Sequence, residues 1–317
     1  MTYSNNISKL AEEIRLRKKT RFRFAGRLMS LAEESSERTI EILRELSFDP
    51  LPRIILGITG APGSGKSLLA NRMISNFREE YPEKMIGVIA VDPSSSLSGG
   101  SILGDRIRMM QHADDSNVFI RSIASHGQTG GITLGTMGIV SVMGLLGCDI
   151  VLIETVGVGQ MEFAVKDVSD IVAIVMAPGQ GDIMQFLKAG LMEVGDMFIV
   201  NKADRPDFSQ FHAQLKNALV LLGRDTKNPV LAVSARDTIG LTELFCVIEE
   251  LFVRDHLFWE ISRKERLDLL IKRAIFSEFQ KRLENVFEKE SKFISQEIWS
   301  GEISLSSILE TLVQKMK

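Results

Sequence analysis

A glycine-rich stretch near residue 60 restricts the possible folds of this chain more than any other feature. The run GITGAPGSGKS, residues 57–67, contains the pattern G-x-x-x-x-G-K-S. It follows the apolar run RIILGIT, which predicts a strand, and it leads into SLLANRMISNFREEY, whose apolar spacing predicts a helix. In this order the loop N–H groups and the helix N-terminus face an anion. The sequence therefore predicts a site for a nucleoside triphosphate.

Lys66 and Ser67 are the residues of this loop with side-chain chemistry. We expect Lys66 to reach the β- and γ-phosphates and the Ser67 hydroxyl to bind Mg²⁺. Phosphoryl transfer needs little covalent chemistry from the protein, so a catalytic role for Lys66 is charge stabilisation. The predicted nucleotide-binding residues of the loop are Gly60, Ala61, Pro62, Gly63, Ser64, Gly65, Lys66, Ser67 and Leu68.

Seven short apolar runs between residues 53 and 255 predict the fold class. They are rich in Val and Ile and nearly continuous in apolarity, which suits a parallel sheet covered on both faces. Segments with helical spacing, such as LTELFCVIEELF, lie between them. The prediction is a doubly wound α/β fold with a mostly parallel sheet. The runs are RIILGIT, MIGVIAVD, NVFIRSIA, DIVLIET, DIVAIVMAP, DMFIVNK and NPVLAVS.

Helical patterns on both sides of this region predict three zones. Residues 1–50 form an N-terminal helical extension that ends at the helix-breaking D-P-L-P, residues 49–52. Residues 51–255 form the nucleotide-binding domain. In residues 256–317 the apolar stripe of RKERLDLLIKRAIFSEFQKRLENVFEKE fits either a helix packed on its own domain or an oligomerisation arm, and its length favours the arm.

Composition excludes several classes of function. The net charge of −3 indicates no basic field for nucleic acid or an acidic membrane surface. No run of 18 apolar residues predicts a membrane span, and the N-terminus has no apolar core of a signal peptide. The two cysteines, Cys148 and Cys246, are too few for a disulfide framework or a zinc site, and both are expected to be buried. These features predict a cytoplasmic protein.

Acidic residues at strand ends are the candidate Mg²⁺ ligands. Glu154 is the last residue but one of DIVLIET, at the end of an apolar strand, where an acid can hold the ion directly or through water, whereas Asp149 at the start of that run is expected to be solvated. Asp92 ends MIGVIAVD, and Asp105 lies in the polar loop that follows. That loop could change its order with the γ-phosphate. The candidate metal ligands are Ser67, Asp92, Asp105 and Glu154.

The run NKAD, residues 201–204, predicts a guanine base. Asp204 can accept hydrogen bonds from guanine N1–H and N2–H₂, a donor pair that adenine lacks. Asn201 can bond the N7/O6 edge or tie loops together, and the stem of Lys202 can lie along the base. A second loop, Ser234, Ala235 and Arg236, follows NPVLAVS, and a backbone N–H there can donate to guanine O6.

Five motifs in a fixed order resemble the MeaB/MMAA family of GTPases, also known as the arginine/ornithine transport-system kinase type, within the SIMIBI class of P-loop proteins. They are GAPGSGKS, VDPSSSLSGGSILGDRIRM, ETVGVGQ, PGQGDIMQFLKAGLMEVGD and NKAD, and the likeness covers roughly residues 10–290. The resemblance implies a GTPase chaperone of an adenosylcobalamin-dependent acyl-CoA mutase, chiefly methylmalonyl-CoA mutase. Such a chaperone gates cofactor loading and protects the mutase from inactivation. The resemblance also implies a homodimer joined by a C-terminal helical arm.

Further site residues follow from the resemblance. Residues 179–188 match a switch that senses nucleotide and touches the mutase, with Asp182 and Lys188 as its polar contacts. Gln160 invites comparison with water-positioning glutamines, although helix capping or a partner contact fits it equally well. The catalytic candidates are Lys66, Gln160 and Lys188. His126 stands where the family has Arg, which leaves open another client such as isobutyryl-CoA mutase.

Two alternative functions have recognisable requirements. A transport-system protein kinase would need a protein acceptor for the γ-phosphate. A GTP-dependent metallochaperone would need a Cys or His cluster, yet the four histidines are scattered at residues 112, 126, 212 and 256. The GTPase switch instead predicts slow intrinsic hydrolysis that speeds up on partner docking, because the motifs contain no obvious arginine finger.

Overall fold

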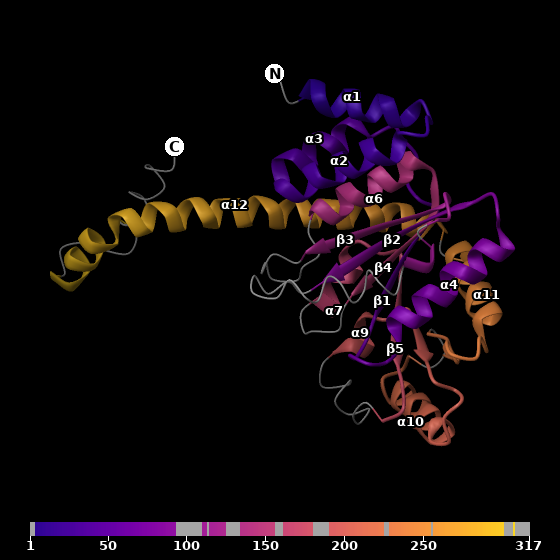
Figure 1. The fold of residues 1–317 in the computed structure, drawn as a ribbon. Helices are drawn as coiled ribbons and strands as arrows, with labels where there is room; N and C mark the ends of the chain where they lie inside the picture. The colour runs from indigo at the N-terminus through magenta and orange to yellow at the C-terminus, as the bar shows by residue number, and fades with distance from the viewer. Residues whose placement is uncertain are drawn as a thin grey trace. The chain divides into compact units, whose positions relative to one another are not determined.

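The chain folds into two compact units, residues 1–267 and residues 268–317, in a computed structural model (Figure 1). The residues described are 4–92, 110–112, 114–124, 134–155, 161–179, 190–224, 228–254, 256–300 and 307. The last long helix, α12 (His256–Ser300), begins in the first unit and continues into the second. Within the described residues, none of the helices combines the length and apolar character that a bilayer crossing requires.

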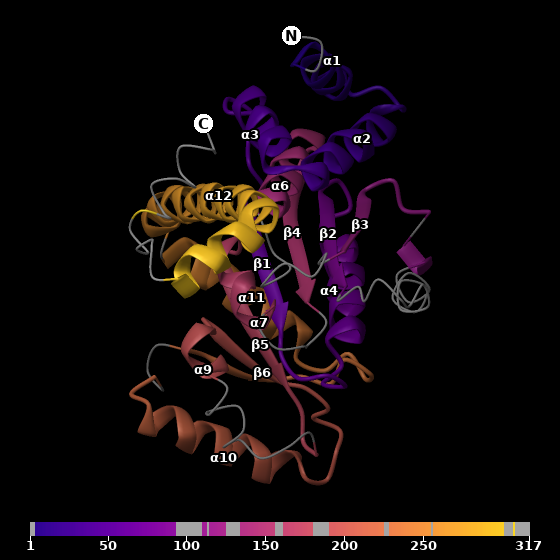
Figure 2. The ribbon, with the colours of Figure 1, turned by 90° about the vertical axis from the view of Figure 1, so that its left-hand side faces the viewer.

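A seven-stranded sheet forms the centre of the first unit, and all its neighbouring strands are parallel. The strand order is β3-β2-β4-β1-β5-β6-β7, and Figure 2 labels the strands from β1 to β6. Each predicted apolar run contains one strand, so the prediction of a doubly wound α/β fold is confirmed. The strands are β1 (Ile54–Thr59), β2 (Met85–Asp92), β3 (Val118–Ala124), β4 (Cys148–Thr155), β5 (Ile171–Met176), β6 (Met197–Val200) and β7 (Val230–Ala232).

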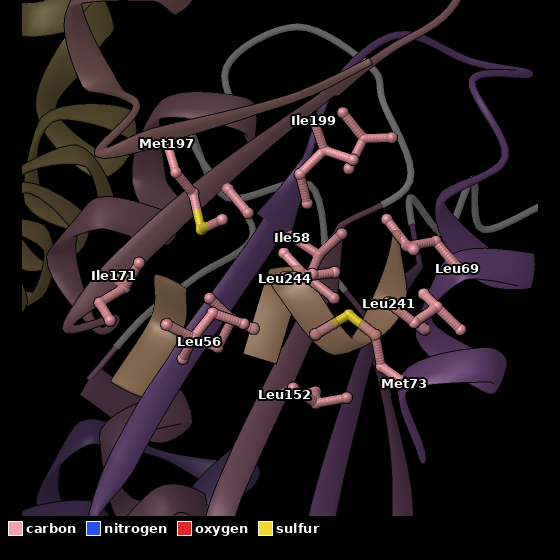
Figure 3. Close-up of a cluster of buried hydrophobic side chains, with 14 of the residues drawn as sticks. Leu56, Ile58, Leu69, Met73, Leu152, Ile171, Met197, Ile199, Leu241 and Leu244 are labelled. Atoms are coloured by element: carbon pink, nitrogen blue, oxygen red, sulfur yellow. The ribbon is translucent and has the colours of Figure 1, made fainter. Parts of the chain in front are cut away.

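One face of the sheet packs against α4 (Lys66–Glu80) and α11 (Leu241–Arg254), as Figure 3 shows. Burying each Leu or Ile side chain contributes about 1.5–3 kcal/mol. Because α4 starts directly at the glycine loop, this packing also fixes the position of that loop. The labelled core residues are Leu56, Ile58, Leu69, Met73, Leu152, Ile171, Met197, Ile199, Leu241 and Leu244.

The opposite face carries α6 (Leu134–Leu146), a helix that is apolar on all sides. Twelve of its 13 residues are buried. Such a helix needs cover on every side. The sheet covers one side, and the N-terminal helices α1 (Ser4–Arg15), α2 (Arg21–Glu34) and α3 (Ser36–Glu45) cover the other (Figures 1 and 2). The N-terminal helices therefore complete the core of the first unit.

Ser35 separates two helices of the N-terminal segment, α2 and α3. It has an extended backbone between α2 and α3, and its side chain accepts a hydrogen bond from the Arg38 N–H as the N-cap of α3. A capping hydroxyl satisfies one of the free N–H groups at a helix start. The N-terminal segment therefore consists of separate helices, α1, α2 and α3.

Gly144 of α6 and Gly26 of α2 lead to opposite predictions for the same change, Gly→Ala. A Cβ at Gly144 would lie 2.3 Å from the Pro50 carbonyl oxygen, whereas one at Gly26 would meet nothing within 4 Å. We expect Gly144→Ala to lower the free energy of unfolding by about 2 kcal/mol through overpacking. We expect Gly26→Ala to raise it by up to about 1 kcal/mol through helix propensity. Urea unfolding measures both, and a shift of the same sign in the two variants contradicts this packing.

Three aspartates close the amino-terminal edge of the sheet. The first N–H groups of a strand have no ladder partner there, and each aspartate carboxylate accepts one of them. Asp149 was predicted to be solvated; that prediction is wrong, since the residue is half-buried and accepts such a bond. The pairs, measured from carboxylate oxygen to backbone nitrogen, are Asp149 with Met85 at 3.0 Å, Asp170 with Ile55 at 2.9 Å and Asp196 with Val172 at 2.8 Å.

Asp170 also holds the start of α12. Its fully buried carboxylate accepts hydrogen bonds from Arg263 Nε at 2.8 Å and Arg266 Nη2 at 2.7 Å. Arg263 donates further to the carbonyl oxygens of Pro52 and Arg53, just before β1. Burial lowers the pKa of Arg266, and the charge of Asp170 opposes that effect. The beginning of α12 is therefore tied to the starts of β1 and β5.

The cysteines differ in their surroundings. Cys148, at the start of β4, is buried, and burial raises the pKa of its thiol to about 12. Cys246 on α11 is exposed, so the prediction that both cysteines are buried is correct for one and wrong for the other.

Candidate nucleotide-binding site

The glycine loop connects β1 to α4 at the carboxyl edge of the sheet. Gly60 has a φ of 135°, and a Cβ there would lie 2.0 Å from the Val175 carbonyl oxygen on β5. Gly65, with a φ of 88°, is the N-cap of α4, and its Cβ would lie 2.5 Å from Asn201 Nδ2. Only glycine fits either position, because the φ values are left-handed and a side chain has no room.

Lys66 lies inside the loop that it terminates. Only 6% exposed, it donates hydrogen bonds to the carbonyl oxygens of Gly60 at 2.7 Å and Ala61 at 2.9 Å. These carbonyls solvate the buried ammonium group and hold its charge at the N-terminus of α4. The ammonium charge and the helix N-terminus together favour an anion such as a phosphate.

Ser64, in the middle of the loop, shows that the loop fits a phosphate group. Its hydroxyl is fully buried and has no hydrogen-bond partner within the part of the chain that the structure describes. A buried hydroxyl without a partner costs about 1–3 kcal/mol. A phosphate oxygen would accept a hydrogen bond from it and remove this cost.

Ser67 and Glu154 form a pair of oxygen ligands beside the loop. The Ser67 hydroxyl donates to Glu154 Oε1 at 2.6 Å, and Glu154 is 4% exposed. Glu154 lies at the end of β4, in register with Ile58 of β1. Hydroxyl and carboxylate oxygens are the ligands that Mg²⁺ prefers, so the pair fits this ion.

The other predicted metal ligands are less completely described. Asp92 is the last residue of β2, in register with Ala124 and at the same edge of the sheet as Glu154, but its side chain lies outside the described residues. Asp105 lies wholly outside them. Among the residues described, no group of three or more His, Cys, Asp or Glu side chains is placed to hold a metal ion.

Asn201, directly after β6, ties the predicted base-binding loops to the glycine loop. Its Nδ2 donates to the Ser64 carbonyl oxygen at 2.8 Å, and its Oδ1 accepts from the Ala235 N–H at 3.1 Å. Lys202, with a φ of 62°, donates from Nζ to the Gly63 carbonyl oxygen at 2.8 Å. Of the two roles that the sequence left open for Asn201, the structure shows the tying of loops.

Asp204 is held by the loop after β7. Ser234 Oγ donates to Asp204 Oδ1 at 2.8 Å, and Arg236 Nη2 lies 3.5 Å from Asp204 Oδ2. A hydrogen bond with Asp237 raises the pKa of Arg236, and the charge of Asp204 adds to this effect. The same hydrogen bond lowers the pKa of Asp237. Asp204 and residues 234–236 therefore come together as predicted for a base-binding site.

Several predicted residues lie outside the described residues, and one contact was not predicted at all. Gln160, Lys188, Asp182 and His126 belong to the first group. The unpredicted contact is a hydrogen bond from Arg72 Nε on α4 to the Ala235 carbonyl oxygen at 3.1 Å. No motif marks Arg72, since it lies within an ordinary helical sequence.

These loops gather at the carboxyl ends of β1, β4, β6 and β7, where open α/β sheets bind their ligands. The strand, glycine loop and helix, the acid on β4 and the N-K-x-D run after β6 define a P-loop GTPase. The chain therefore binds a guanine nucleotide.

Comparison with known proteins identifies the family. The family model described as methylmalonyl Co-A mutase-associated GTPase MeaB matches residues 25–287. A provisionally named GTPase of Pyrococcus abyssi is 41% identical over 244 residues, which are 75% of each chain. The mouse (Mus musculus) mitochondrial methylmalonic aciduria type A homolog is 35% identical over 252 residues, 76% of this chain and 59% of that protein. The chain belongs to the MeaB family of methylmalonyl-CoA mutase-associated GTPases.

A solved structure agrees with the fold. The crystal structure of an LAO/AO transport system kinase superposes with a TM-score of 0.69 at 21% sequence identity, covering 98% of both chains. At this identity the likeness shows the shared architecture and nothing about the reaction.

Proposed function

We propose that this protein is a GTP-hydrolysing chaperone of an adenosylcobalamin-dependent acyl-CoA mutase, with methylmalonyl-CoA mutase as its client. It gates cofactor loading and protects the mutase from inactivation. The observation that carries the proposal is the match to the mutase-associated family over residues 25–287, a range that contains all three nucleotide loops. The likeness to the transport system kinase supports the fold only, so the kinase function has no specific support.

Each described residue of the site has a distinct task in the proposed reaction. Lys66 replaces its hydrogen bonds to the loop carbonyl oxygens with hydrogen bonds to phosphate oxygens, and its positive charge stabilises the negative charge of the phosphates. Ser67 and Glu154 hold Mg²⁺, which neutralises charge on the β- and γ-phosphates when bound. Asp204 selects guanine through N1–H and N2–H₂. Gln160, Lys188, Asp92 and Asp105 keep the roles that their motifs predict.

The proposal includes a homodimer in the cytoplasm, joined through residues 256–317. Three apolar side chains on α12 support the dimer. Ile275 is 60% exposed, Phe276 is 73% exposed and Phe279 is 48% exposed. Exposed large apolar side chains close together on one helix are typical of an interface.

The test is GTP hydrolysis by the purified protein with and without methylmalonyl-CoA mutase loaded with adenosylcobalamin. We expect slow hydrolysis alone and about a tenfold or greater increase with the mutase, because partner docking orders the switch segments. ATP should be inert, and Lys66→Ala should remove hydrolysis under both conditions. Isobutyryl-CoA mutase in a parallel sample tests the other client.

An unchanged rate with both mutases contradicts the chaperone proposal. Transfer of the γ-phosphate to another protein, followed with labelled GTP, would favour the kinase instead.

A further inference from the structure

We propose that Arg72 is a positioning residue for guanine recognition, because it anchors the loop of residues 234–236 to the helix that begins at the phosphate loop. The inference rests on the proposed assignment of Asp204 and this loop to the base. It concerns a residue outside every motif of the site.

The backbone of Ala235 is held at both of its polar groups. Its carbonyl oxygen accepts from Arg72 Nε at 3.1 Å, and its N–H donates to Asn201 Oδ1 at 3.1 Å. The preceding residue, Ser234, donates to Asp204 Oδ1 at 2.8 Å. The position of the Ala235 backbone therefore determines where Ser234 holds the carboxylate of Asp204.

Arg72 connects this base loop to the phosphate loop through one rigid element. It lies on α4 six residues after Lys66, about 9 Å along the helix axis. Buried contacts between α4 and α11 hold the helix in place. Because Lys66 and Arg72 share a helix, the phosphate ligands and the base loop have a fixed separation. The inferred role of Arg72 is to preserve that separation.

Arg72→Met tests the inference, because it keeps the apolar stem and removes the donor. We expect the KM for GTP to rise about 5–10-fold with little change in kcat, since base contacts stabilise ground and transition states alike. We also expect the preference for GTP over ITP to fall by a similar factor. The base of ITP lacks the 2-amino group of guanine, which donates a hydrogen bond to Asp204. A displaced Asp204 would lose this hydrogen bond, so GTP would keep less of its advantage over ITP.

Two further variants separate positioning from general stability. Arg72→Lys keeps a donor for the Ala235 carbonyl and should restore most of the GTP preference. Arg78→Met changes another arginine of α4, which bonds Asp115 and the carbonyl oxygens of Tyr81 and Lys84. It should lower stability and leave the GTP-to-ITP ratio unchanged. An unchanged ratio in Arg72→Met overturns the inference.

Asp204→Asn in the same series shows which proposal fails. If this change removes the preference for GTP over ITP and Arg72→Met does not, the base site stands and the role of Arg72 is refuted. If Asp204→Asn leaves the preference intact, the assignment of the base site is wrong and the inference fails with it.

Discussion

Replacing Asp204 with Asn is expected to lower the affinity for GDP by about 100-fold and to create affinity for xanthosine diphosphate. The carboxylate can accept from both guanine N1–H and N2–H₂, and a hydrogen bond to a charged group is worth about 1.5–3 kcal/mol. The Asn amide would instead turn a donor toward the 2-amino group. Xanthine carries an oxygen at that position, which accepts from the amide. Calorimetric titration with GDP and with xanthosine diphosphate measures both changes.

The structure supplies a close control for Asp204→Asn. Asp207 lies three residues further on and pairs with Arg205 at 2.9 Å, with both side chains more than 40% exposed. Asp207→Asn makes the same chemical change without touching the base loops, so its GDP affinity should match that of the unmodified protein. If Asp204→Asn binds GDP as well as Asp207→Asn does, guanine is not recognised by Asp204.

Replacing Asp170 with Asn is expected to lower the free energy of unfolding by about 3–5 kcal/mol. The Asp170 carboxylate is fully buried, and it balances the positive charges of Arg263 and Arg266, whose side chains are 18% and 11% exposed. Removing one partner of a buried ion pair leaves an uncompensated charge, which accounts for a loss of this size. Denaturant unfolding measures the loss. Hydrogen exchange in residues 256–267 should also rise, because Asp170 anchors the start of α12.

A double-mutant cycle tests whether the loss comes from the ion cluster. Adding Arg266→Met to Asp170→Asn removes one of the unpaired cations. The double variant should therefore lose about 1–3 kcal/mol less stability than the sum of the losses in the two single variants. Glu249→Gln breaks the exposed pair with Arg53, at 3.7 Å, and should change stability by less than about 1 kcal/mol. A loss below about 1 kcal/mol in Asp170→Asn would refute its anchoring role.

The strands and the motifs could be predicted because their signals are local. Each strand is a Val- and Ile-rich run that is covered on both faces, and all seven were located from the sequence. The helix α6 was not assigned, because an apolar helix such as LGTMGIVSVMGLL lacks the 3.6-residue periodicity of apolar and polar positions that marks a half-buried helix. The N-terminal helices that pack on α6 were predicted only as an extension, because nothing in the sequence indicated the surface that they cover.

Aspartates at strand starts show the same limit. Asp149, Asp170 and Asp196 each precede or begin an apolar run, and by sequence alone such a residue is equally suited to solvent. Their acceptor role depends on the strand order, which brings the starts of neighbouring strands next to them. The anchoring of Arg263 and Arg266 on Asp170 adds a contact that spans 93 and 96 residues of sequence.

The sequence by itself determined the ligand class, because phosphate and guanine are recognised by short contiguous runs, GAPGSGKS and NKAD, whose backbone and side chains act within a few residues of one another. Only the tertiary structure decided how those runs are held together. Asn201 bonds Ser64 across 137 residues, and Arg72 bonds Ala235 across 163. Such contacts arise from the order of strands in the sheet and the packing of α4 on it, which no local pattern in the chain specifies.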